Sequence, residues 1–426
     1  MKQLLFLIIL IFLISCSEEK KELITDVEEY NHYLVSSNNE SYNNAISEIN
    51  FWNNRIKKDS SGVGELGPLA AAYTTLFETT GDVINLQKAE LLYKKAIAVS
   101  ANNKDSYVRA LGRNLISQHR FKEAKSILEE SYQGVSNKRA TEMVLFDVYM
   151  ELGEYEKANE CLAKVKNLKD FSYLIRLAKW NDHKGDLEIA IKYMEKAKAI
   201  AESRNSTSLK IWTYTNLGDY YGHHGAIKKA YSYYLQTLKL QPDNVYAKVR
   251  IAWITYAAEE NILEAHRILD SVMKNYKGLD TYLFKAELAE FSENVSEARR
   301  LNTVFIEKAE NSTAVSMYNT YLIRLYAETN AEKAFQIAQQ EINDRATPNT
   351  YHNVAFAQLK NGMKKEALQT IESHVIGKTF EPMALYHAAL IFKANGLDDK
   401  VEALKKNLKN AAYELGPVLF RKIGEL

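Results

Sequence analysis

The sequence predicts an all-α protein, built as a solenoid of repeated helix pairs, and three observations support this. The 426 residues include only 5 prolines and 17 glycines, too few for the many turns of an all-β chain. Apolar residues recur at i, i+3, i+4 and i+7 through most of the chain, which is the spacing of amphipathic helices. A small residue, usually alanine, returns about every 35 residues from Ala89 to Val401. One array of small units therefore replaces the several separate domains that the length alone would suggest.

The composition excludes several functional classes. The 55 Lys and Arg residues balance 54 Asp and Glu residues, so no net charge attracts nucleic acid. Two cysteines are too few for a disulfide scaffold or a zinc cluster. The apolar share of 46% and the charged share of 26% are those of an ordinary folded protein.

The first residues are typical of an export signal. The range 4–14 is an unbroken apolar run of eleven residues, whereas a helix that spans a bilayer needs about 20. Lys2 supplies the basic flank of a signal peptide. The run ends in Leu-Ile-Ser-Cys at Cys16, which resembles the lipobox of bacterial lipoproteins. The resemblance implies removal of residues 1–15 and acylation of Cys16, enough for stable anchoring; an ordinary signal peptide with a chance cysteine is the alternative.

Residues 16–26 form a charged tether behind the anchor. Ser17 follows Cys16, as in lipoproteins sorted to an outer membrane, and the Glu/Lys cluster 18–22 resembles the surface-export signal of Bacteroidota lipoproteins. A solvated linker is the alternative for this cluster. The expected location is the bacterial cell envelope, at the outer membrane, with periplasmic and surface exposure both left open. The remaining cysteine, Cys161, is expected to be a small core residue.

Two helices are expected before the repeats, within residues 27–62. Tyr42, Ala45 and Ile49 begin an apolar stripe on the second of them. We expect the two to form a helical hairpin that covers the apolar face of the first repeat. The solenoid itself is expected over residues 66–424.

The segment from Trp212 to Asn244 resembles the tetratricopeptide repeat. It contains Asn216, Leu217, Gly218, Tyr221, Gly225, Ala230, Tyr234, Leu238, Leu240, Pro242 and Asn244. The small residues of the second helices recur at Ala89, Ala124, Ala158, Ala190, Ala230, Ala265, Ala298, Ala334, Ala367 and Val401. The resemblance implies a right-handed superhelical solenoid of about ten helix pairs.

Glycine and proline mark the boundaries of the expected helices. Turn glycines recur between paired helices at Gly81, Gly153, Gly185, Gly225, Gly362 and Gly396, but Glu293 and Thr329 stand at two such positions. The five prolines, Pro68, Pro242, Pro348, Pro382 and Pro417, are expected between repeats, because proline inside a helix costs about 3 kcal/mol.

The sequence lacks the recognisable motifs of catalysis. None of the nine histidines belongs to a His-Glu-x-x-His motif, and neither a phosphate-binding loop nor a Gly-x-Ser-x-Gly elbow occurs. We therefore expect no enzyme, no cofactor and no metal site.

The resemblance also implies a concave groove, lined by the first helix of each pair. The residues expected to line it are Arg113, Asp147, Lys179, Trp212, Asp219, Trp253 and Tyr256. Aromatic anchors beside charged residues suit a peptide or a helix of a protein partner. The alternative is that these residues only complete the packing between repeats.

The function expected from these features is a non-catalytic, lipid-anchored scaffold for protein–protein interaction. One alternative is a ligand-binding outer-membrane lipoprotein similar to the SusD-like family, although this chain has almost none of the long polar loops of that family. Another is an assembly factor for outer-membrane proteins. The partner, the face of the membrane and the oligomeric state stay open.

Overall fold

The computed structural model describes residues 23–35, 39–56, 63–102, 104–134 and 137–426. Within these ranges the regular structure is helical, without a β-strand. The signal peptide, Cys16 and most of the tether lie outside the described residues, so their predictions stay predictions. In the described part of the chain, no helix is both long enough and apolar enough to cross a membrane.

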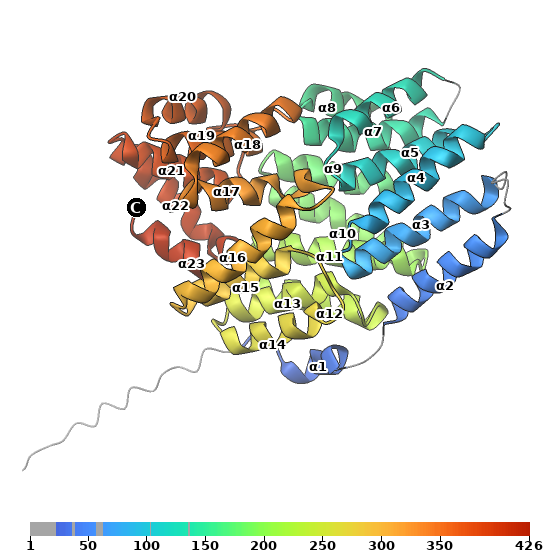
Figure 1. Ribbon diagram of the computed structural model, residues 1–426, viewed down its shortest axis with the longest axis horizontal. Helices are drawn as coiled ribbons and strands as arrows, with labels where there is room; N and C mark the ends of the chain where they lie inside the picture. Colours follow the sequence, from blue (N-terminus) through green and yellow to red (C-terminus); the bar gives the residue numbers. More distant parts are fainter. Residues whose placement is uncertain (1–22, 36–38, 57–62, 103, 135–136) are drawn as a thin grey trace, which may run out of the picture.

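Ten consecutive helix pairs form the body of the described chain, as predicted (Figure 1). They are α3 (Val63–Thr80) with α4 (Ile84–Val99), α5 (Lys104–Ser117) with α6 (Phe121–Gln133), α7 (Lys138–Leu152) with α8 (Tyr155–Lys164), α9 (Phe171–His183) with α10 (Leu187–Ser203), α11 (Thr207–His223) with α12 (Ile227–Leu240), α13 (Val245–Ala257) with α14 (Ile262–Met273), α15 (Asp280–Phe291) with α16 (Val295–Glu310), α17 (Asn319–Thr329) with α18 (Ala331–Asp344), α19 (Pro348–Lys360) with α20 (Lys364–His374), and α21 (Pro382–Ala394) with α22 (Asp398–Leu408). The remaining elements are α1 (Val27–Val35), α2 (Glu40–Arg55), α23 (Ala412–Gly424) and the short 3-10 helices η1 (Val315–Tyr318) and η2 (Lys409–Ala411).

Small residues allow the two helices of a pair to approach closely. Ala124, Ala230 and Ala367 are fully buried in second helices, where the repeat pattern places them. At the crossing of α11 and α12, a Cβ atom added to Gly218 would lie 2.4 Å from the ring of Tyr234. The ring of Tyr234 therefore occupies the space that a larger residue at 218 would need.

The turns inside the pairs use the left-handed backbone conformation, with or without glycine. Gly153 has φ of 75°, and the next amide, that of Glu154, donates a 2.9 Å hydrogen bond to the carbonyl of Tyr149. This bond closes the helix end. Glu293, at a turn position that lacks glycine, adopts φ of 59°. The turn geometry thus persists where the glycine signal is missing.

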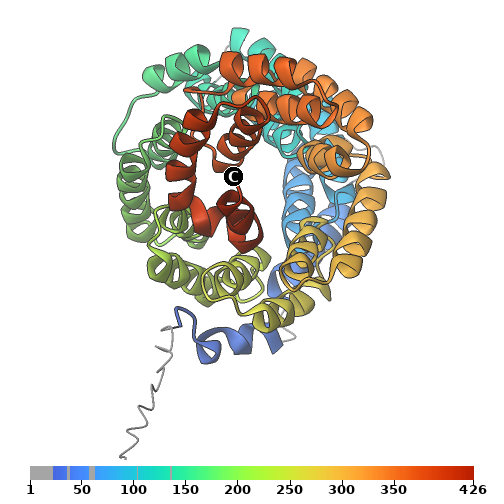
Figure 2. The same cartoon turned by 90° about the vertical axis from the view of Figure 1, so that its left-hand side faces the viewer.

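The first helices of the pairs line the inner side of the superhelix, and the second helices lie outside. Figure 2 shows the pairs arranged as a ring, with α1 outside it and the C-terminal helices within it. The contacts agree, because α1 packs against the second helices α12 and α14, whereas α23 packs against the first helices α11, α13 and α15.

The superhelix completes a turn, so segments far apart in sequence meet along a seam. The Lys277 amide donates a 2.7 Å hydrogen bond to the carbonyl of Thr80. The Ser316 hydroxyl donates a 3.1 Å bond to the carbonyl of Gln118, 198 residues earlier. The guanidinium of Arg345 lies 3.5 Å from the carboxylate of Glu151. We call this line of contacts, between the turns of early pairs and the loops of later pairs, the seam.

The predicted N-terminal hairpin is wrong in one respect. Both helices exist, and α2 covers α3 through Ala45 and Ile49, as expected. However, α1 does not fold back onto α2. Its buried residues Tyr30 and Leu34 join the core of α12 and α14 instead. The Tyr30 hydroxyl also donates a 2.6 Å hydrogen bond to Glu264. The apolar face of α1 is therefore buried against α12 and α14, in the middle of the solenoid.

The proline prediction holds at three positions and fails at two. Pro348 and Pro382 each begin a helix, and Pro242 lies between α12 and α13. Pro68 instead lies inside α3, and Pro417 lies inside α23, directly after a break at Gly416. At Gly416 the backbone has φ of 77° and ψ of 162°, so the proline continues a second helical piece rather than interrupting one.

Candidate protein-binding face

A buried ion pair joins α7 to α9 on the inner side. Arg176 donates a 2.5 Å hydrogen bond to the Asp147 carboxylate and a 2.7 Å bond from Nε to the carbonyl of Met143. The Arg176 side chain is only 9% exposed. Removal of either side chain would leave the charge of the other without its partner, so the pair favours this packing of α7 against α9. The predicted groove residue Asp147 therefore has a structural bond that its sequence position did not reveal.

Lys179 belongs to a second charged group that reaches the seam. Its ammonium lies 3.0 Å from Glu151, which also faces Arg345. Burial favours the neutral form of Glu151, but the charges of Lys179 and Arg345 outweigh it and lower the pKa of that carboxyl. Burial likewise opposes the charge of Lys179, but Glu151 and Asp147 raise its pKa. Lys179 is thus held charged while its side chain stays 43% exposed.

Arg113 on α5 is the exposed cation of this region. Its side chain has no hydrogen bond or ion pair with the residues that the structure describes. Surrounding protein atoms and the nearby Arg176 both lower its pKa, and Asp147 counteracts them. The predicted residues Arg113, Asp147 and Lys179 therefore lie in one charged region of the inner surface, in which Arg113 can receive an anionic group.

Trp212 lies near the beginning of α11, apart from these charges. It is 40% exposed, and its ring meets that of Phe171 edge-on at a centroid distance of 6.1 Å. An exposed indole held by a neighbouring ring keeps one face available to a partner.

Asp219, also on α11, is engaged by its own chain. Its carboxylate accepts hydrogen bonds from the hydroxyls of Tyr234 at 2.8 Å and Tyr246, and lies 3.2 Å from Arg250. Burial raises the pKa of Tyr246, Arg250 lowers it, and the charge of Asp219 raises it further, so that the net change is a rise. The sequence did not reveal these partners, because they come from the second helix of one repeat and the first helix of the next.

Trp253 and Tyr256 lie under α23. The Trp253 indole Nε1 donates a 2.9 Å hydrogen bond to the carbonyl of Tyr413. Tyr256 is fully buried, and its hydroxyl donates a 3.1 Å bond to Glu287.

We define the inner face as the face of α11, α13 and α15 that carries Asp219, Trp253 and Tyr256. Part of the predicted groove is therefore occupied by the C-terminal segment of the same chain (Figure 2).

Two carboxylic acids at this contact have strongly raised pKa values. Burial raises the pKa of Glu287 to about 7, against the hydrogen bond from Tyr256. Burial and the neighbouring Asp182 raise the pKa of Glu414 on α23 to about 7 as well. Burial and the charge of Glu414 also raise the pKa of Glu381. The contact between α23 and the inner face therefore disfavours ionised carboxylates.

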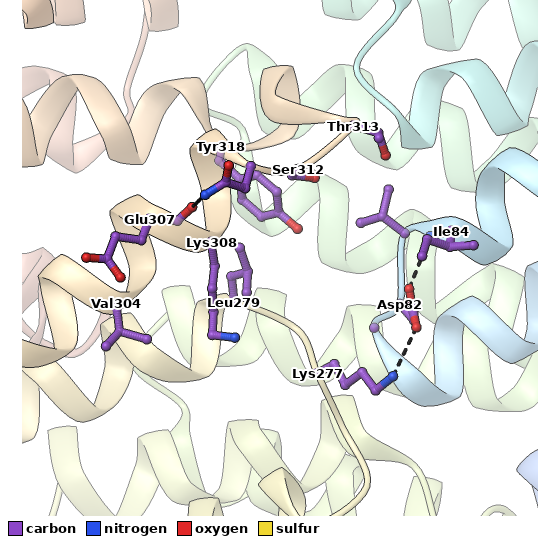
Figure 3. Close-up of a pocket in the computed structure, with 13 residues that line it drawn as sticks. Asp82, Ile84, Lys277, Leu279, Val304, Glu307, Lys308, Ser312, Thr313 and Tyr318 are labelled. Carbon is purple, nitrogen blue, oxygen red and sulfur yellow. Dashed lines mark hydrogen bonds and ion pairs between the residues drawn. The ribbon is translucent and has the colours of Figure 1, made fainter.

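A cavity lies elsewhere, at the seam. It has a volume of about 540 Å³ between the turn that precedes α4 and the loops around α16. Figure 3 shows Asp82 and Lys277 on one side of it, joined by a 3.1 Å ion pair, with Lys308 and Tyr318 opposite. The residues that line the cavity belong to two successive turns of the superhelix, so the cavity is a place where the two turns do not pack tightly.

The described residues contain no group of three or more His, Cys, Asp or Glu side chains arranged to hold a metal ion. Two histidines, His352 on α19 and His387 on α21, bond to each other through their Nδ1 atoms at 2.9 Å and are buried. Burial lowers the pKa of His352 to about 3 and that of His387 well below its ordinary value. The structure thus uses these histidines as neutral core residues.

No protein-family model matches the sequence, and no curated protein matches it. Solved structures with similar helical architecture include a tetratricopeptide repeat protein from Parabacteroides merdae, yeast Tom70 and human IFIT1. The P. merdae protein is 15% identical with a TM-score of 0.39, over 57% of this chain and 96% of the other. Tom70 is 13% identical with a TM-score of 0.41, over 91% and 95%. IFIT1 is 14% identical with a TM-score of 0.44, over 91% and 100%.

These values are too low to carry an inference about function. The repeat assignment rests instead on the ten helix pairs of this chain and the small residues at their crossings. In that architecture the chain is similar to tetratricopeptide-repeat proteins.

Proposed function

We propose that this protein is a non-catalytic scaffold for protein–protein interaction, anchored by lipid in a bacterial cell envelope. One observation supports the choice of binding face. The inner face of α11, α13 and α15 already binds a helical segment, α23, through an indole hydrogen bond, the packing of Tyr413 and a cation–π contact of Arg421 with Phe291. A surface that accommodates a helix of its own chain has the shape and chemistry to accommodate a helix of a partner.

The binding face extends beyond the occupied part. Arg113 and Trp212 are exposed on inner helices and are not covered by α23. Trp212 on α11 and Arg113 on α5 belong to different repeats, so a partner segment that contacts both of them would extend over several repeats.

The position of α1 is compatible with an anchor that leaves the binding face open. The carboxylate of Glu259 accepts 2.7 Å hydrogen bonds from the amides of both Ile24 and Thr25. These bonds hold the first described residues on the outer side of α12 and α14 (Figure 2). The described end of the tether therefore lies on the side opposite to the inner face.

Site-specific photocrosslinking in cells tests the interaction face. A photoreactive phenylalanine analogue at Trp212 is expected to capture a defined set of proteins. The same analogue at Leu263, which is 84% exposed on the outer helix α14, should not capture that set. A second inner position, Arg113, should capture proteins in common with Trp212. Identical capture from all three positions would show that the inner side has no binding role.

A separate experiment tests the lipid anchor. The Cys16→Ala variant should lose metabolic labelling by a fatty acid and leave the membrane fraction, because the acyl chains supply the membrane affinity. The matched control is Cys161→Ala, whose thiol is buried, with a pKa that burial raises to about 11. This control should keep both the label and the membrane association. Continued labelling of Cys16→Ala would end the lipoprotein assignment.

A further inference from the structure

We propose that α23 is a displaceable internal occupant of the partner site, and that the partner presents an apolar helix with basic residues. The proposal rests on the proposed scaffold function and adds the regulation of the site and the chemistry of its partner. Three features of the contact between α23 and the inner face support it.

The first feature is that α23 stands outside the repeat order. The last helix pair ends with Leu408. The following helix, α23, packs on one side against α21 and α22 of that pair. On its other side it reaches α11, α13 and α15, which belong to much earlier repeats. That contact depends on Gly416. A Cβ atom added there would lie 2.5 Å from the Glu287 carboxylate and 2.9 Å from the Trp253 ring. The segment therefore fits the face closely, as a ligand does, without belonging to a pair.

The second feature is the kind of bond that holds α23 in place. Lys422 forms a 2.8 Å ion pair with Glu290, and the Arg421 guanidinium lies 4.0 Å from the ring centroid of Phe291. The side chains of Lys422 and Glu290 are 48% and 45% exposed, so solvent weakens their attraction. Glu287 and Glu414 meanwhile lie at the contact without a cationic partner within ion-pair distance among the described residues. The buried apolar residues of α23, Leu415 and Ile423, pack instead against α21 and α22. Toward the inner face, the contact thus combines weak, solvent-exposed bonds with buried carboxylates that favour separation.

The third feature is what release of α23 would expose. Trp253, Tyr256 and Phe291 would form an aromatic surface beside Glu287 and Glu290. Large aromatic residues that lie together and become fully desolvated are typical of the centre of protein interfaces. The carboxylates beside them select for positive charge. The chain supplies the positive charge with Arg421 and Lys422, whereas Leu419 and Ile423 of the same helix pack against α21 and α22. A partner that displaces α23 needs such cations beside apolar side chains.

The test uses the full chain and a labelled synthetic peptide of residues 409–426, whose binding is followed by fluorescence anisotropy. The Lys422→Glu variant places two carboxylates opposite each other and weakens the internal contact. We expect it to bind the unmodified peptide about five- to tenfold more tightly than the unsubstituted protein does, because a larger fraction of its sites is open. The control is Lys406→Glu, the same charge change at an exposed position on α22, and it should leave the affinity unchanged.

A second peptide tests for the opposite change in affinity. A peptide that carries Lys422→Glu should bind more weakly to every form of the protein, because it repels Glu290. Hydrogen exchange gives a readout without peptide. The amides of α23 should exchange faster in the Lys422→Glu protein than in the unsubstituted protein, whereas those of α13 should not change. Absence of peptide binding to all forms, with α23 exchanging only as fast as α13, would overturn the proposal.

The two proposals can fail separately. If Trp212 captures a defined set of proteins but the peptide does not bind, only the displacement of α23 is wrong. If the peptide binds as expected and the crosslinks from Trp212, Arg113 and Leu263 are identical, the displacement stands and the scaffold function is wrong.

Discussion

Replacing both His352 and His387 by leucine should remove a large part of the acid sensitivity of this protein. Burial lowers the pKa of His352 to about 3, whereas a histidine in the unfolded chain has a pKa near 6.5. Below that value the unfolded chain binds a proton that the folded chain does not. The stability is therefore complete above about pH 6.5 and falls as the pH is lowered toward 3. For His352 alone the loss amounts to about 3 kcal/mol at pH 4.

The measurement is the free energy of unfolding in urea at pH 7 and at pH 4. The leucine pair loses the bond between the two Nδ1 atoms and the stacking of His387 on Phe356, so its stability at pH 7 can differ from that of the unsubstituted protein. The test is therefore the change between the two pH values, which should be smaller by about 3 kcal/mol or more in the variant. The control is His224→Leu, at a side chain that is 44% exposed, and it should keep the original pH dependence. An unaltered pH dependence in the leucine pair would contradict the assignment.

Glu287 and Glu414 act in the opposite direction over a neighbouring range. Their pKa values are raised to about 7, so the folded chain binds protons there that the unfolded chain does not bind until about pH 4.5. Their contribution to stability therefore increases as the pH falls from about 7 to about 4.5. Because both histidine variants retain these acids, the difference between variants isolates the histidine contribution.

Gly81→Ala is expected to destabilise the protein more than Gly225→Ala, although both glycines have left-handed backbone. Their φ values are 66° and 80°, and an alanine in this region costs about 1–2 kcal/mol at either position. At Gly225 nothing lies within 4 Å of an added Cβ atom. At Gly81 the added atom would lie 2.5 Å from the backbone nitrogen of Gly278, across the seam. The backbone of the next superhelical turn must then move, which adds about 1–3 kcal/mol.

Two measurements separate the seam from the turn itself. Urea unfolding should show the larger loss for Gly81→Ala. Hydrogen exchange should show faster exchange at the Lys277 amide in Gly81→Ala only, because that amide bonds to Thr80 across the seam. Equal losses in the two variants would mean that the seam contributes nothing to stability.

The local units were predictable because their causes are local. The small residue at each helix crossing, the apolar face of each helix and most turn glycines lie within about 35 residues of one another. The pair of helices that carry Gly218 and Ala230 follows from such neighbours alone. Even Glu293, which replaces a turn glycine, keeps the left-handed turn, because the helices on either side impose it.

The candidate site was predictable only in part. The sequence placed Arg113, Asp147, Lys179 and Trp212 on inner helices, and their neighbours along the repeat explain this. It did not predict that Trp253 would meet Tyr413, since the two are 160 residues apart and no local signal marks that contact. The bond of Tyr256 to Glu287 was missed because it joins α13 to α15, the first helix of the next pair. The bonds of Asp219 to Tyr246 and Arg250 were missed for the related reason that they join neighbouring repeats.

The helix pairs, their order and the small residues that let them cross follow from the amino-acid sequence alone. Three features depend on the assembled superhelix: the seam between its turns, the place of α1 on α12 and α14, and the contact of α23 with the inner face. They arise because a small rotation between successive pairs is added at every repeat. The total rotation over several repeats brings Lys277 to Thr80 and Tyr413 to Trp253. The sequence of a single repeat does not show this total rotation.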